Sequence, residues 1–112
     1  MTDKLGWEGA SGATYTFTKF GIDVSLKPDQ DGVYIFAKTT NRGFDAVYIG
    51  QGDLKTRIAA HINTGCVNRK DADTIFCFNE ASEAKRLSAE SDLLALHTEA
   101  YSPTGCNVKE GG

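Results

Sequence analysis

The sequence predicts an α+β domain, with a small antiparallel β-sheet of three or four strands flanked by helices. Three patterns lead to this fold class. Side-chain character alternates with period two in the neighbouring segments 32–38 and 47–50, which is typical of paired strands. Apolar residues recur every four positions over 54–62, and a longer helical pattern fills 80–101. At 112 residues the chain is long enough for one domain with a modest core.

The first 31 residues form a lead-in segment that we expect to pack on the domain. In residues 15–20, aromatic side chains alternate with threonine, which predicts a strand. Pro28 and the polar residues 29–31 then indicate a turn into the next strand.

Residues 32–50 predict a β-hairpin. Its turn lies at 39–43, where Asn and Gly tolerate a positive φ. A hairpin folded about Asn41 places Tyr34 directly opposite Tyr48, with their Cβ atoms roughly 4.5–5.5 Å apart. The two tyrosines would then share one face of the sheet.

A helix is predicted directly after the hairpin, over residues 54–63. Asp53 is a suitable N-cap and Gly65 a suitable end for it. Arg57 and His61 are four residues apart, so both side chains leave the helix on one polar face. Because the helix begins so soon after the hairpin, both should lie near the second tyrosine.

A strand at 74–78 precedes the long second helix. Leu87 and Leu94 mark an apolar stripe on this helix, and Glu90 lies in the middle of the stripe. A buried carboxylate is costly unless it is paired or binds a metal. A salt bridge to Arg86, one turn earlier, is the alternative to a functional role for this glutamate.

Several residues resemble, in type and order, the motifs of the GIY-YIG endonucleases, and in particular of their small single-domain bacterial members. These are Gly32-Val33-Tyr34, Tyr48-Ile49-Gly50, Arg57, His61, Glu90 and Asn107. The resemblance implies a GIY-YIG-like nuclease domain over residues 32–108, followed by a flexible tail at 109–112. It also implies a metal-dependent endonuclease that hydrolyses phosphodiester bonds in nucleic acid, with DNA favoured over RNA.

The resemblance implies a role for each of these side chains. Tyr34 would be the general base that takes a proton from the attacking water, and Tyr48 would orient the water or the scissile phosphate. Arg57 would hold the phosphate, a task suited to a permanently charged planar guanidinium group. A free tyrosine has a pKa of about 10, so a tyrosine base needs positive charge nearby.

The metal and the supporting residues follow from the same resemblance. Glu90 would be the single protein ligand of one Mg²⁺ or Mn²⁺ ion, with water and phosphate oxygens completing the shell. One carboxylate fits a one-metal site better than a two-metal site. His61 would form hydrogen bonds near the attacking water, and Asn107 would brace the site by tying the C-terminal segment to the hairpin.

The net charge of −3 argues against strong non-specific binding of nucleic acid. Between residues 54 and 70, however, the chain carries basic residues and no acidic ones. Of these, Lys55, Arg69 and Lys70 are the predicted nucleic-acid contacts. Because no further DNA-binding motif is attached, targeting must come from the structure of the substrate or from a targeting protein. The alternative function is a catalytically silent module of the same fold that binds nucleic acid or a partner protein.

The sequence has no apolar run of membrane-spanning length and no leader, which predicts a cytoplasmic protein without membrane contact. In such a reducing compartment we do not expect a structural disulfide. Cys77 alternates with apolar residues and should be a small buried side chain. A zinc site made of His61, Cys66 and Cys106 is a less favoured alternative, because the usual ligand spacing is missing.

Overall fold

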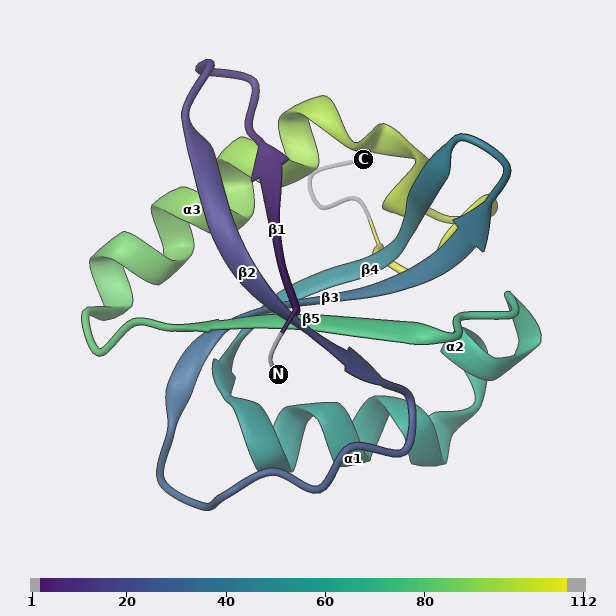
Figure 1. The fold of residues 1–112 in the computed structure, drawn as a ribbon, viewed down its shortest axis with the longest axis horizontal. Helices are drawn as coiled ribbons and strands as arrows, with labels where there is room; N and C mark the ends of the chain where they lie inside the picture. The colour runs from purple at the N-terminus through teal and green to yellow at the C-terminus, as the bar shows by residue number, and fades with distance from the viewer. Residues whose placement is uncertain (1–2, 109–112) are drawn as a thin grey trace.

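The computed structural model describes residues 3–108 (Figure 1). In chain order the described elements are β1 (Asp3–Glu8), β2 (Thr14–Gly21), β3 (Asp31–Thr40), β4 (Gly43–Asp53), α1 (Leu54–Thr64), α2 (Cys66–Arg69), β5 (Thr74–Asn79), α3 (Glu83–Leu96) and the 3₁₀ helix η1 (Thr98–Ala100). The tail expected at 109–112 lies outside the described residues. No helix of the described range is long and apolar enough to cross a membrane.

The strands form one antiparallel sheet in the order β1-β2-β5-β3-β4. The α+β class is confirmed, but residues 3–108 contribute five strands to the sheet instead of the expected three or four. The strand that the sequence did not predict is β1. Trp7 is its one buried side chain, so the strand lacks the apolar alternation that would reveal it. The lead-in segment therefore supplies two strands of the sheet itself.

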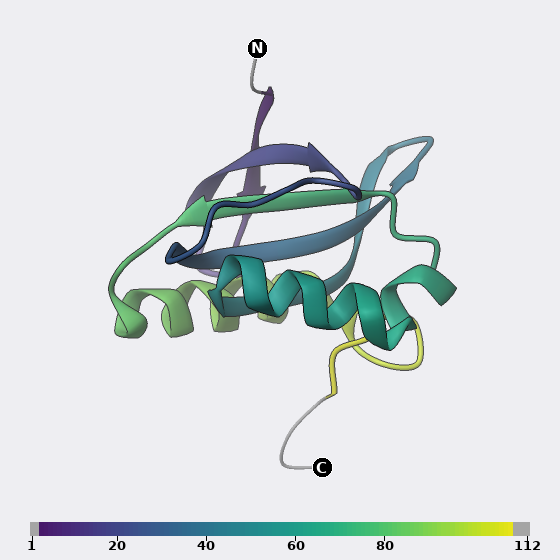
Figure 2. The ribbon, with the colours of Figure 1, turned by 90° about the horizontal axis from the view of Figure 1, so that it is seen from below.

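Helices cover both faces of the sheet. Figure 1 shows α1 on one side of the strands and α3 on the other, whereas the turned view of Figure 2 draws both helices below strands β2, β5 and β3. The alternation of β3 divides its side chains between these two layers. Ile35 packs in the cluster that contains Leu93 of α3, whereas Tyr34 packs in the cluster that contains Leu54 and Ile58 of α1. Tyr34 thus faces the helix that carries the predicted arginine and histidine.

The β3–β4 hairpin differs from the predicted register. Tyr34 lies opposite Gly50, and Phe36 lies opposite Tyr48. The turn has two central residues, 41–42, and a β-bulge near the middle of the hairpin adds one more residue to β4. The prediction that the two tyrosines are directly opposite is therefore wrong. The offset is two residues, so they still share one face, because side chains alternate with period two.

Helix α1 begins where it was predicted and ends one residue later. The Asp53 carboxylate accepts a hydrogen bond from the Thr56 backbone N–H at 3.1 Å. Gly65 adopts the left-handed conformation, with φ of 86°, at the C-terminal end. Local capping residues were sufficient to define both ends.

Helix α3 is shorter than the predicted range 80–101. Ser82 caps its first turn by accepting a hydrogen bond from the Lys85 N–H. Its buried side chains include Arg86 and Leu93, whereas Leu87 is 44% exposed. The stripe that we marked with Leu87 was therefore partly wrong. The helix is rotated so that an arginine faces inward.

Candidate active site

The candidate site lies at the β4 edge of the sheet, where the C-terminal segment (residues 99–108) covers the strand. The Cys106 N–H donates to the Val47 carbonyl oxygen at 2.8 Å, and the Ala46 N–H donates to the Glu99 carboxylate at 3.1 Å. These bonds use backbone groups that an edge strand otherwise leaves unpaired. The C-terminal segment is therefore part of the site's framework.

Two stacked tyrosines form the centre of the site. The ring centroids of Tyr34 and Tyr48 are 6.0 Å apart, with an angle of 22° between the ring planes. Gly50 makes this arrangement possible. A Cβ atom at this position would lie 2.5 Å from the Tyr34 Oη and 2.8 Å from the Tyr48 Cε1. The glycine is thus required by the close approach of both rings.

His61 contacts the tyrosine pair from α1. Its Nε2 lies 3.0 Å from the Tyr34 Oη, and its ring centroid lies 4.0 Å from that of Tyr48. Burial, and then the charge of Arg57, lower the pKa of His61. The imidazole is therefore neutral near pH 7. In the tautomer with its proton on Nδ1, Nε2 accepts the hydrogen bond from the Tyr34 hydroxyl.

The charges of Arg57 and Glu90 act on both tyrosines. Burial raises the pKa of Tyr34, which is 1% exposed, far above its ordinary value. Glu90 raises this pKa further and Arg57 lowers it. Burial also raises the pKa of Tyr48, which Glu90 raises further and Arg57 lowers. Five of the predicted residues therefore lie near one another beside β4: Tyr34, Tyr48, Arg57, His61 and Glu90.

A pocket of about 540 Å³ opens between β4, α3 and the C-terminal segment. Tyr48, Glu90, Tyr101 and Asn107 are among its lining residues. Carboxylate oxygens suit Mg²⁺ or Mn²⁺, and Mg²⁺ keeps several waters when a single carboxylate binds it. Within residues 3–108, no three His, Cys, Asp or Glu side chains gather in a way that could hold a metal. A site with one carboxylate does not need such a group.

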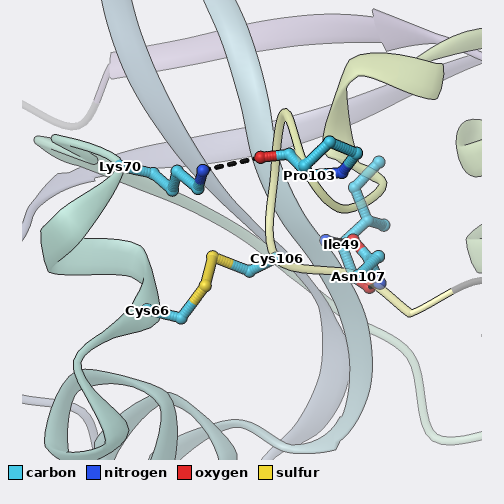
Figure 3. Close-up of a disulfide and its surroundings, with 6 residues drawn as sticks. All are labelled: Ile49, Cys66, Lys70, Pro103, Cys106 and Asn107. Carbon is cyan, nitrogen blue, oxygen red and sulfur yellow. Dashed lines mark hydrogen bonds between the residues drawn. A yellow bond between two sulfur atoms is a disulfide. The ribbon is translucent and has the colours of Figure 1, made fainter.

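Asn107 ties the C-terminal segment to β4. Its Oδ1 accepts a hydrogen bond from the Ile49 N–H, and its Nδ2 donates to the Ile49 carbonyl oxygen, both at 2.9 Å (Figure 3). Ile49 is the residue between Tyr48 and Gly50. The bracing contact that the resemblance implies for Asn107 is therefore present.

Cys66 and Cys106 form a disulfide, which corrects the expectation that the chain has none (Figure 3). The bond uses two of the three residues considered for zinc, so that alternative is wrong. Cys77 is reduced and buried, as predicted, and burial raises its pKa to about 12. The paired cysteines are separated by 40 residues, and only the packing of α2 against the C-terminal segment brings them together.

Arg86, which the sequence analysis considered as a salt-bridge partner of Glu90, is a buried residue of the site's surroundings. Its Nε donates to the Gln51 Oε1 at 3.0 Å, and its Nη1 donates to the carbonyl oxygens of Glu80 and Ala81 at 2.9 Å. It also forms an ion pair with Asp31 at 3.9 Å. These contacts join the start of α3 to β3 and β4, one turn before the glutamate. The position of the arginine one turn from that glutamate was the available signal.

The predicted nucleic-acid contacts lie on α1 and on or directly after α2. Lys55 and Arg69 are exposed on α1 and α2. Lys70 is partly buried, and its Nζ donates to the Pro103 carbonyl oxygen at 2.6 Å. Lys55 and Arg69 can therefore meet an external phosphate chain, whereas Lys70 already contacts the C-terminal segment.

No family model, curated protein or solved structure matches this chain. The structure defines an α+β protein with a tyrosine–histidine cluster at a covered sheet edge. Its resemblance to the GIY-YIG endonucleases stays a prediction.

Proposed function

We propose that the chain is a GIY-YIG-type, metal-dependent endonuclease that hydrolyses phosphodiester bonds in nucleic acid, with DNA as the favoured substrate. The observation that carries the proposal is the gathering of Tyr34, Tyr48, His61, Arg57 and Glu90 at the β4 edge. Displacement at phosphorus needs a proton acceptor, a cation and a means of stabilising developing negative charge. These side chains supply each of them.

Tyr34 and His61 would act together as the general base. Burial keeps the pKa of Tyr34 high, so the hydroxyl alone holds its proton. The neutral His61 accepts that proton at Nε2, 3.0 Å away, as the Tyr34 oxygen takes one from the attacking water. Tyr48 stacks on Tyr34 and lines the pocket, so it orients the water or the phosphate.

Arg57, directly, and Glu90, through a bound metal ion, would stabilise the negative charge of the phosphate. The guanidinium group of Arg57 binds phosphate oxygens through its planar fork. Glu90 holds one Mg²⁺ or Mn²⁺ ion, which when bound supplies positive charge to the phosphate. Lys55 and Arg69 bind neighbouring phosphates of the strand. Because the net charge is −3, a targeting protein would help to select the substrate.

A catalytically silent module is the second candidate. The observation that favours it is the burial of Tyr34, which is 1% exposed and whose raised pKa keeps it protonated. In this function the tyrosine–histidine cluster is a packing core. The exposed Lys55 and Arg69 would then bind nucleic acid or a partner protein.

A cleavage assay separates the two candidates. Labelled single-stranded, duplex, branched and flap DNA, with matching RNA, is incubated with the full chain and Mg²⁺, Mn²⁺ or EDTA. We expect DNA cleavage with either metal and none with EDTA. Absence of cleavage on every substrate, together with salt-sensitive binding that EDTA does not change, would favour the module.

Glu90→Gln tests the metal ligand within the same assay. The change removes the charge at nearly constant volume and should abolish cleavage. Glu83→Gln, in the exposed first turn of the same helix, is the matched control and should cleave like the parent. Equal cleavage by Glu90→Gln and the parent would contradict the metal role of Glu90.

A further inference from the structure

The C-terminal segment is held by side-chain hydrogen bonds and by a disulfide, and Figure 3 shows the residues of both side by side. Asn107 bonds both backbone groups of Ile49 in β4. Cys106, the preceding residue, is bonded covalently to Cys66 of α2. Opening of the disulfide at Cys106 therefore acts directly beside Asn107, the residue that braces β4.

The disulfide joins the two sides of the candidate site. Cys66 begins α2, which follows α1, the helix of the predicted arginine and histidine, after one residue. Cys106 donates its N–H to Val47, the residue before Tyr48, and it lines the pocket that contains Glu90. One covalent bond thus links α2, the helix next to α1, to the C-terminal segment that lines the pocket.

Both cysteines are partly exposed, so a small thiol can reach the bond between them. Lys70 adds a second tie between the end of α2 and the segment, through the Pro103 carbonyl oxygen at 2.6 Å. This bond is non-covalent and exchanges readily. Of these two contacts between α2 and the C-terminal segment, the disulfide is the one that opens only when a chemical reductant is present.

We propose that Cys66 and Cys106 are a redox-reversible site that controls how firmly the C-terminal segment braces the candidate active site. A dithiol thiolate attacks one sulfur, the Sγ–Sγ bond breaks, and a mixed disulfide forms. The second thiol of the reductant then closes its own disulfide. The two cysteines take up two electrons and two protons, and the dithiol loses them.

Reduction leaves the segment with non-covalent contacts alone, so Asn107 separates from Ile49 more often. The cytoplasm that we expect from the sequence would drive the pair toward this reduced form. The effect of the disulfide on the contact between Asn107 and Ile49 is independent of the function of the site. An effect of the disulfide on cleavage rests on the proposed nuclease function.

Amide hydrogen exchange of the full chain, with and without dithiothreitol, tests the proposal. The Ile49 N–H bonds to Asn107 and reports the brace, whereas the Ile35 N–H in the central strand β3 reports opening of the whole fold. We expect reduction to raise exchange at Ile49 by about tenfold more than at Ile35. An equal factor at both positions, as a purely global cross-link would give, overturns the proposal.

Two variants complete the test. The double variant Cys66→Ser, Cys106→Ser fixes the open form and should show fast Ile49 exchange that dithiothreitol does not change. Cys77→Ala removes the buried reduced cysteine, keeps the pair, and should respond like the parent. If the double variant does not fold, the parent and Cys77→Ala decide the matter, because each is compared with and without reductant.

Cleavage measured on the same samples keeps the two proposals apart. We expect reduction to slow cleavage in the parent and in Cys77→Ala, and to leave the double variant unchanged. Equal cleavage before and after reduction would overturn control of catalysis. If no sample cleaves at all, the proposed nuclease function fails while the exchange result still decides on the redox site.

Discussion

Asn107→Ala tests how strongly the brace stabilises the β4 edge. Asn107 is 7% exposed, and its Oδ1 and Nδ2 each lie 2.9 Å from a backbone atom of Ile49. The Ile49 side chain is fully buried. Alanine removes both partners at once, so β4 keeps one donor and one acceptor without their protein hydrogen bonds.

The expected cost follows from these two groups. A buried polar group left without a partner costs about 1–3 kcal/mol. The pocket beside Asn107 admits some water, so the lower half of that range applies, and the pair together should cost about 3 kcal/mol. A domain of this kind has roughly 5–15 kcal/mol of total stability. At about 4 °C per kcal/mol, Tm should fall by roughly 12 °C.

Equilibrium urea denaturation measures the change in the free energy of unfolding, and an unchanged m value shows that the fold is retained. Val108→Ala is the matched control, because Val108 is the next residue and is 79% exposed. It should change the free energy by less than about 0.5 kcal/mol. A loss below about 1 kcal/mol in Asn107→Ala would refute the reasoning, since water would then be replacing both bonds.

Three further predictions concern the tyrosine cluster. Gly50→Ala places a methyl group 2.5 Å from the Tyr34 Oη, so it should cost about 1–3 kcal/mol in urea denaturation and shift the ring resonances of both tyrosines; unchanged spectra would contradict the packing argument. His61 has a lowered pKa in the fold, so the free energy of unfolding should decrease as pH falls below 6.5, because the unfolded chain then binds a proton that the folded chain resists. His61→Asn should flatten that slope, and an equal slope would assign it to other groups. Arg57→Lys should lower the cleavage rate by about 10²–10³ while changing DNA affinity little, and a loss confined to affinity would indicate the silent module.

The elements that sequence analysis predicted well are those whose signals are local. Asp53 and Gly65 defined α1 through capping and a left-handed end. The alternation around Tyr34 defined β3 and the face that its tyrosine occupies. Cys77 was predicted as a buried residue of β5 for the same reason. In each case the information lies within one or two turns, or within one strand, of the residue concerned.

The predictions that failed depended on contacts between distant parts of the chain. The hairpin register shifted because the turn has two central residues and a bulge in β4 adds one more, which no local pattern marks. The rotation of α3 depends on Arg86, whose partners Asp31 and Gln51 lie in other elements. Strand β1 was missed because it is an edge strand with one buried side chain.

The sequence by itself therefore determined the α+β class, the helix and strand around the predicted site, and the chemical types of its side chains. The tertiary structure alone decided that Tyr34 stacks on Tyr48 across an offset register, that Asn107 bonds Ile49, and that Cys66 meets Cys106 across 40 residues. The physical reason is range. Capping and alternation act between near neighbours in the chain, whereas these contacts exist once the sheet has closed and the C-terminal segment covers its β4 edge.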